Sequence, residues 1–98
     1  MKNFDNKNIP NCLKKYRKIA GLSQKEVADI LGVKSTSMIS RWEKGLCLPR
    51  PLSMFKLAIL YRTMVDALFF DLRRALINEL RKREEKVLGN GTKDNEDR

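Results

Sequence analysis

The chain has 98 residues and a formal net charge of +9, with 42% hydrophobic residues. This length allows one domain, which can bury roughly two thirds of the surface that its unfolded chain would expose. The sequence contains no histidine, and its two cysteines, Cys12 and Cys47, do not form a C-x-x-C pattern. A zinc site is therefore excluded, and we expect no cofactor. We expect two free thiols in a reducing cytoplasm, with a disulfide between them as the alternative.

Residues 1–8 are polar and contain no apolar signal core, and no apolar run approaches the roughly 18 to 20 residues of a membrane span. The sequence therefore predicts a soluble cytoplasmic protein.

The positive charge is concentrated in the first two thirds of the chain. Residues 1–62 contain 13 Lys or Arg and 4 Asp or Glu, a net charge of +9, whereas residues 63–98 contain 8 of each. A basic segment attracts polyanions, because phosphates that are neutralised by cations release their condensed counterions. This distribution favours a nucleic-acid partner, and the alternative is a basic surface that only maintains solubility.

The pattern predicts an all-α fold. A flexible arm over residues 1–8 precedes a first helix that starts near Ile9 or Pro10 and ends at about Ala20, before Gly21. The run Ser23-Gln24-Lys25-Glu26 is a capping box and starts a second helix, which Gly32 ends.

A third helix is expected over residues 35–45, because Ser35 can cap its start and Gly45 can end it. Its apolar positions Ile39 and Trp42 are three apart, and we expect Trp42 to pack in the core rather than stack on a base. The tight turn between the second and third helices predicts a helix-turn-helix motif over residues 23–45.

The C-terminal third is expected to be helical as well. Pro51 starts a fourth helix, residues 62–64 form a short break, and the apolar spacing from Val65 onwards predicts a single helix to about Leu88. Residues 89–98 are predicted to be a disordered tail.

The residues named above resemble the XRE family, the helix-turn-helix proteins typified by the phage lambda and 434 repressors and Cro. The resemblance covers about residues 9–70 and rests on Arg17, Gly21-Leu22-Ser23-Gln24-Lys25-Glu26-Val27-Ala28, Leu31-Gly32-Val33, Ile39-Ser40-Arg41-Trp42-Glu43-Lys44-Gly45 and Leu48-Pro49. It implies a compact five-helix lambda-repressor-like DNA-binding domain over residues 9–71, with the third helix in the DNA major groove. The resemblance says nothing about residues 72–88, where the apolar spacing predicts a C-terminal helical extension.

The resemblance also implies a role for each matched position. Thr36, Ser37 and Arg41 fall where the family reads base edges. Ser40 lies on the same polar face and is also predicted to read bases. Gln24, Lys44 and Arg50 fall where the family contacts the DNA backbone. As cations near these positions, Lys25 and Lys34 are also expected to contact phosphates, and the alternative for each of the four cations is plain surface. Arg17 and Glu43 would form a structural ion pair between the first helix and the end of the third. Two positions depart from the family pattern: Lys34 is an extra turn residue, and Arg62 replaces a glycine that usually follows the fourth helix.

Arg41 can pair with O6 and N7 of a guanine, and the alternative is that it contacts a phosphate. The apolar stripe Leu72, Leu76 and Leu80 is predicted to be a dimer or partner surface, and the alternative is that it packs back on the domain.

The sequence therefore predicts a transcriptional regulator, such as a repressor, that binds double-stranded DNA. We expect a cytoplasmic, nucleoid-associated homodimer on a palindromic operator, with half-sites about 34 Å apart. The alternative is an antitoxin-like module whose C-terminal segment covers a protein partner such as a toxin. An enzyme is not expected, because the sequence has neither paired carboxylates in a plausible pocket nor a glycine-rich phosphate loop.

Overall fold

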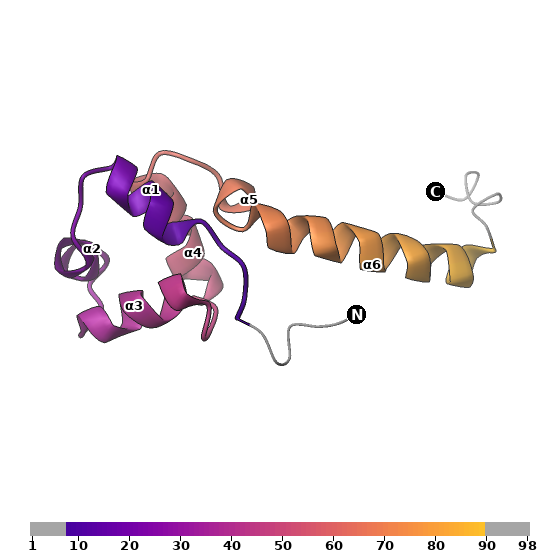
Figure 1. The fold of residues 1–98 in the computed structure, drawn as a ribbon, viewed down its shortest axis with the longest axis horizontal. Helices are drawn as coiled ribbons and strands as arrows, with labels where there is room; N and C mark the ends of the chain where they lie inside the picture. Colours follow the sequence, from indigo (N-terminus) through magenta and orange to yellow (C-terminus); the bar gives the residue numbers. More distant parts are fainter. Residues whose placement is uncertain (1–7, 90–98) are drawn as a thin grey trace.

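The structure, a computed structural model, describes residues 8–89 and is all-helical over that range, as predicted. The helices are α1 (Leu13–Ile19), α2 (Gln24–Leu31), α3 (Thr36–Lys44), α4 (Pro51–Leu60), α5 (Val65–Leu68) and α6 (Phe70–Leu88) (Figure 1). Helices α1–α5 form a compact domain, and α6 projects from it. The predicted tail lies outside the described residues except for Gly89, and the predicted arm except for Asn8.

The domain has one hydrophobic core. Its buried side chains come from all five helices of the domain and from the residues that follow α4 and α5: Leu13, Val27, Ala28, Ile39, Trp42, Leu57, Ala58, Tyr61, Leu68 and Phe69. Trp42 is only 6% exposed, so the prediction that it packs in the core is confirmed.

Helix α2 starts where the capping box predicts. The Ser23 side chain accepts a hydrogen bond from the Glu26 backbone N–H at 3.0 Å, and the Glu26 carboxylate accepts one from the Ser23 N–H at 2.9 Å. Each side chain thus satisfies a backbone donor that the first turn of a helix leaves without a partner.

Helix α1 starts later than predicted, at Leu13 rather than at Ile9 or Pro10. The Asn11 side chain accounts for this difference, because its Oδ1 accepts a hydrogen bond from the Leu13 N–H at 2.9 Å. The Ile9 N–H donates to the carbonyl of Gly45 at 2.8 Å, which holds the preceding segment against the end of α3. A short polar side chain that hydrogen-bonds to nearby backbone competes with helix formation, and here it delays the start of α1.

The prediction of a single helix over residues 65–88 is wrong. Phe69 has non-helical backbone angles (φ −126°, ψ 43°) and separates α5 from α6. The Leu68 carbonyl accepts a hydrogen bond from the Cys12 N–H at 2.8 Å. The break lets Leu68 and Phe69 enter the core while α6 leaves the domain. The apolar spacing continues through this break, so the sequence pattern did not reveal it.

Helices α1 to α4 all end in the same type of turn. After the first three helices a glycine occupies the left-handed position, and after α4 Arg62 occupies it. The turns after α1, α2 and α3 place Gly21, Gly32 and Gly45 at φ between 76° and 79°. The turn after α4 has the same pair of hydrogen bonds, from Arg62 N–H to the Ile59 carbonyl at 3.1 Å and from Thr63 N–H to the Ala58 carbonyl at 2.9 Å. Arg62 adopts φ 57° there, a left-handed conformation that disfavours a residue with a Cβ. The glycine that the family usually has at this position can adopt this conformation without strain, whereas Arg62 is strained.

We predict that Arg62→Gly raises the free energy of unfolding by about 0.5–1 kcal/mol, because the relief of left-handed strain exceeds the entropy gained by the unfolded chain. The matched control is Arg62→Ala, which removes the same side chain but keeps the Cβ. Urea denaturation of both variants checks this prediction, and equal stabilities of the Gly and Ala variants would contradict it.

Candidate nucleic-acid interface

Helix α3 has one buried face and one polar face. Ile39 and Trp42 are buried, whereas Ser37, Arg41 and Lys44 are exposed. These three residues follow one another at spacings of four and three, so they form a single stripe on the side of the helix opposite the core. The Ser35 side chain caps the helix by accepting a hydrogen bond from the Ser37 N–H at 3.0 Å.

Glu43 is the only acidic residue of α3, and its carboxylate faces the domain rather than the solvent. The Arg17 Nε donates to Glu43 Oε2 at 2.6 Å, and the Arg17 Nη2 donates to Oε1 at 3.2 Å. The Gln24 Nε2 also donates to Oε1, at 3.0 Å. These hydrogen bonds tie the end of α3 to α1 and to the first residue of α2. Because Glu43 is occupied in this way, the outer face of α3 carries no carboxylate.

The Arg17–Glu43 pair is buried, with 10% and 5% of the two side chains exposed. The hydrogen bond to Glu43 raises the pKa of the Arg17 guanidinium above its ordinary value, although burial acts in the opposite direction. The Arg17 Nη1 also donates to the Leu22 carbonyl at 2.9 Å. Arg17 therefore carries its charge at any physiological pH and connects α1 to the end of α3 and to the segment before α2.

Tyr61 lies in the electrostatic field of this pair. Burial, and to a smaller extent the negative charge of Glu43, raise the pKa of its hydroxyl to about 12, although the positive charge of Arg17 acts in the opposite direction. Tyr61 is thus neutral at physiological pH and belongs to the core rather than to the polar face of α3.

The Asn11 side chain also holds the end of α3, and this contact was not predicted. The Asn11 Nδ2 donates to the carbonyls of Trp42 and Glu43, at 3.2 and 3.4 Å. These carbonyls lie in the last turn of α3, where the helix leaves its acceptors without partners. A Cβ at position 45 would also collide with the backbone of Ile9, so only glycine allows this segment to lie so close. An asparagine just before a helix can be expected to hydrogen-bond to the backbone of the first turn, but the long-range contact of Asn11 has no local sequence signal.

The structure brings the four predicted base-reading residues together on α3. Thr36, Ser37 and Arg41 are exposed, whereas Ser40 is partly buried. The Ser37 hydroxyl lies 2.6 Å from the Ser35 hydroxyl, so it is engaged within the first turn. Met38 was not predicted, yet 41% of it is exposed on the same helix.

Four of the five residues predicted to contact the DNA backbone are exposed. Lys25, Lys34, Lys44 and Arg50 are exposed, and Gln24 is partly buried against Glu43. Lys25 forms an ion pair with Asp29 at 3.4 Å on the exposed side of α2. Lys34 lies in the turn before Ser35, so the extra turn residue leaves the α3 cap in place.

A comparison with protein-family models gives one match, to the helix-turn-helix model described as HTH_3, over residues 13–66. The chain belongs to the XRE family of helix-turn-helix proteins. No curated protein and no solved structure matches the chain significantly. Membership of the XRE family implies that the chain is a regulator that binds double-stranded DNA, and this family of DNA-binding domains is typically non-enzymatic.

The match to the XRE family ends at residue 66, before α6. In this extension Leu72 is partly buried against the core, so it does not belong to a free stripe, whereas Leu76 and Leu80 are 41% and 61% exposed. The predicted boundary after residue 71 falls inside the continuous helix α6.

Among residues 8–89, no group of three or more possible metal-binding side chains is present. None of the helices in this range has the length and apolar character needed to cross a membrane. Cys12 and Cys47 are separate free thiols.

We predict that Arg17→Met lowers the free energy of unfolding by about 3–5 kcal/mol, because it leaves the Glu43 carboxylate buried without its cation. The double variant Arg17→Met/Glu43→Leu should lose less than the sum of the two single variants, by at least about 1 kcal/mol. Thermal and urea denaturation measure both values.

The matched control is Lys25→Met, which breaks the exposed ion pair with Asp29 and should cost less than about 1 kcal/mol. Additive effects of the two single variants at Arg17 and Glu43 would contradict the assigned coupling.

Proposed function

We propose that this chain is a sequence-specific transcriptional regulator that inserts α3 into the DNA major groove. The observation that carries this proposal is the outer face of α3, which presents hydroxyl groups and cations and no free carboxylate. The major groove is about as wide as an α-helix, and its floor is rich in hydrogen-bond acceptors. The resemblance to phage repressors favours repression, and we place the protein in the cytoplasm with the nucleoid.

Arg41 is the main base reader in this proposal. It lies at the centre of the exposed stripe, and its side chain makes no ion pair within residues 8–89. A guanidinium can donate two hydrogen bonds to the O6 and N7 of guanine, which is worth roughly 1–3 kcal/mol of discrimination against a wrong base.

The first turn of α3 supplies weaker readers. Thr36, Ser37 and Ser40 offer short hydroxyls that can meet several bases, so they discriminate less than Arg41. Met38 adds an exposed apolar side chain of the kind that contacts a thymine methyl group.

Contacts to the phosphates would fix the orientation of α3. Lys25, Lys34, Lys44 and Arg50 are exposed cations on the elements next to the reading face. Gln24 is the first residue of α2, where an amide and the backbone N–H groups can bind a phosphate together. In the structure the Gln24 Nε2 donates a hydrogen bond to Glu43. The amide oxygen of Gln24 and the N-terminal N–H groups of α2 take no part in this contact.

We propose that the regulator acts as a homodimer on a palindromic operator. One module of this size makes few base contacts, and a pair doubles them. Symmetric dimers of this class bind half-sites one helical turn, about 34–36 Å, or a multiple of it apart. Helix α6 is the proposed dimer surface, because none of its 19 residues is buried in the single chain.

The same observation supports a second candidate, an antitoxin-like module in which a different protein, such as a toxin, covers the C-terminal segment. The mass of the chain in solution, measured after purification without a tag from its native host, distinguishes the two. A complex of two copies supports the regulator, and a complex with one other polypeptide supports the antitoxin.

We predict that Arg41→Ala weakens binding to operator DNA from the region upstream of its own gene by roughly 5- to 150-fold and leaves binding to a scrambled duplex nearly unchanged. By contrast, Lys44→Ala should weaken binding to both duplexes equally and reduce the salt dependence by about one released counterion.

Fluorescence anisotropy over a salt series measures both effects, with Lys82→Ala on α6 as the control. Equal affinity of the wild-type chain for operator and scrambled DNA at physiological salt would contradict sequence-specific recognition. An unchanged operator affinity of the Arg41 variant would contradict the role of this residue.

A further inference from the structure

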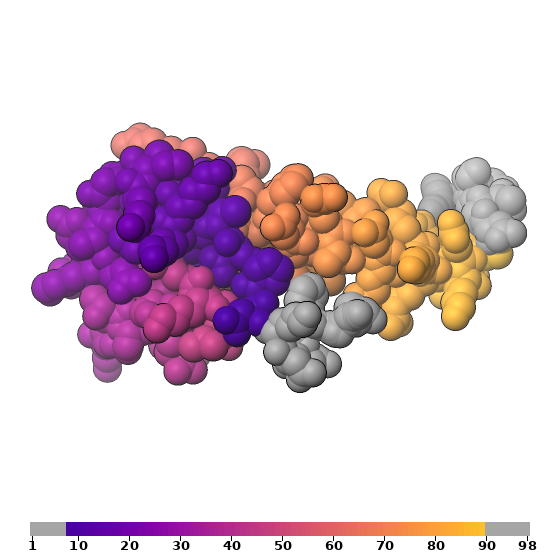
Figure 2. All heavy atoms as spheres, viewed as in Figure 1, coloured from indigo at the N-terminus to yellow at the C-terminus, as the bar shows by residue number. Residues whose placement is uncertain are grey.

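Helix α6 leaves an apolar surface without a cover in the single chain. The helix extends away from the domain body (Figure 2), and the radius of gyration of 16.9 Å exceeds the roughly 12 Å expected of a compact chain of this length. Leu80 is 61% exposed and Val87 is 79% exposed. An isolated helix of this length is marginal in water, so a partner on this face would stabilise it.

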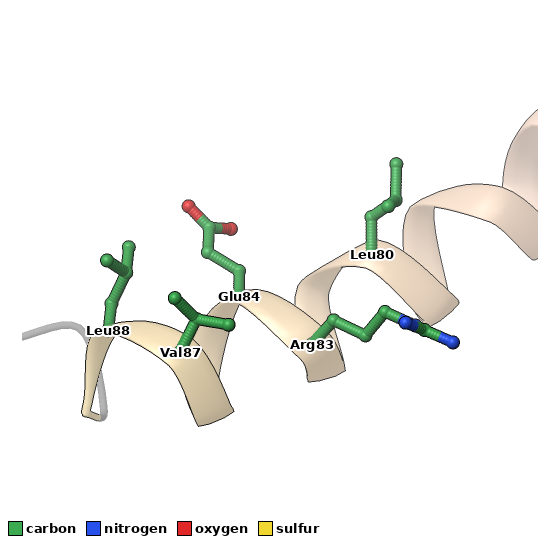
Figure 3. A pocket seen from close by; sticks show the side chains of 5 residues that line it. All are labelled: Leu80, Arg83, Glu84, Val87 and Leu88. Carbon is green, nitrogen blue, oxygen red and sulfur yellow. The ribbon is translucent and has the colours of Figure 1, made fainter.

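The distal half of α6 has a symmetric arrangement of side chains. Leu80, Arg83, Glu84 and Val87 line a shallow hollow together with Leu88 (Figure 3). In sequence order the first four are apolar, basic, acidic and apolar. Reversing the order about the midpoint between residues 83 and 84 exchanges Leu80 with Val87, which are both apolar. It also exchanges Arg83 with Glu84, which have opposite charges. The surface is therefore complementary to its own reversed copy.

We propose that a second copy of this chain covers this surface, with the two α6 helices antiparallel and a two-fold axis between residues 83 and 84. Leu80 of each copy then packs against the partner's Val87, and Arg83 of each copy pairs with the partner's Glu84. The contact is isologous, so one set of four residues supplies both sides of the interface. This proposal rests on the homodimer proposed above and defines how its two copies meet.

The charges favour the antiparallel arrangement over a parallel one. In a parallel pair each residue faces its own copy, so Arg83 would meet Arg83 and Glu84 would meet Glu84, and both contacts are repulsive. Within residues 8–89 no ion pair engages Glu84, so its carboxylate is available. Arg83 contacts Glu79 of its own helix at 3.6 Å, and the five donors of a guanidinium can serve a second carboxylate as well.

This arrangement determines the distance between the two DNA-binding domains. Phe70 lies between 13 and 14 residues from the proposed axis, and a helix rises 1.5 Å per residue, so the two Phe70 Cα atoms would be about 40 Å apart. Helix α3 lies in the domain, beyond the start of α6 as seen from the distal end of that helix (Figure 1). A separation of one helical turn, about 34 Å, is then too short, and half-sites about two turns apart fit the pair.

The interface is small. It involves about two turns of each helix, and contacts below about 1,200 Å² are typical of weak and reversible complexes. We therefore expect a dimer that dissociates on dilution and that DNA strengthens, because binding of one domain raises the effective concentration of the other at its half-site.

Sedimentation equilibrium of the full chain over a range of concentrations tests the proposal. The wild-type chain should show a monomer–dimer equilibrium, and Arg83→Glu and Glu84→Arg should each be monomeric, because each places like charges in contact. An equimolar mixture of the two single variants should recover dimers, as should the double variant Arg83→Glu/Glu84→Arg. Recovery in the mixture separates pairing between copies from loss of the Arg83–Glu79 contact within one helix.

The matched control is Lys82→Glu, which makes the same charge change on the opposite side of α6 and should still dimerise. A wild-type chain that stays monomeric at the highest concentration overturns the proposal, as does a mixture that fails to recover dimers. Single variants that remain dimeric also overturn it, because the copies would then meet elsewhere. DNA binding that still depends on Arg41 in a chain that does not pair would leave the proposed DNA-binding function standing and reject only this interface.

Discussion

The buried ion pair between Arg17 and Glu43 is the interaction on which the arrangement of the helix-turn-helix depends. It connects α1 to the last turn of α3, and Gln24 adds a hydrogen bond from the start of α2 to the same carboxylate. A buried pair contributes little net stability compared with well-packed apolar residues, because removing two charges from water is costly. Loss of one partner is strongly destabilising, however, so the pair selects one arrangement of the three helices.

The same pair also determines the charge of the outer face of α3. Glu43 is the only acidic residue of α3, and its carboxylate lies on the inner side of the helix with a cation and an amide around it. The outer side retains Arg41 and Lys44, so the structural role of Glu43 and the electrostatic role of the outer face are linked. An exposed carboxylate there would oppose binding to phosphates, and burial of Glu43 removes this cost.

Much of the helix-turn-helix could be predicted from local sequence signals. The capping box at Ser23 and the glycine after each of the first three helices indicate where these helices start or end, and both depend only on neighbouring residues. The register of Ile39 and Trp42 likewise predicts which face of α3 is buried.

The features that the sequence did not reveal depend on contacts between distant residues. The Asn11 amide reaches the end of α3, and the Cys12 N–H binds the carbonyl of Leu68, next to the break at Phe69. Leu72 shares the periodicity of Leu76 and Leu80, yet only Leu72 is close enough to the break to pack on the core. The assignment of DNA contacts rests on the family pattern and on exposure, so it remains a prediction for α3.

The most direct test of the account is a titration of the isotope-labelled chain with operator DNA, followed by the amide signals in two-dimensional NMR at physiological salt. The account predicts that the largest changes occur between residues 34 and 44 and near Lys25 and Arg50. Changes concentrated on the exposed side of α4, or no response of α3 to DNA, would contradict it.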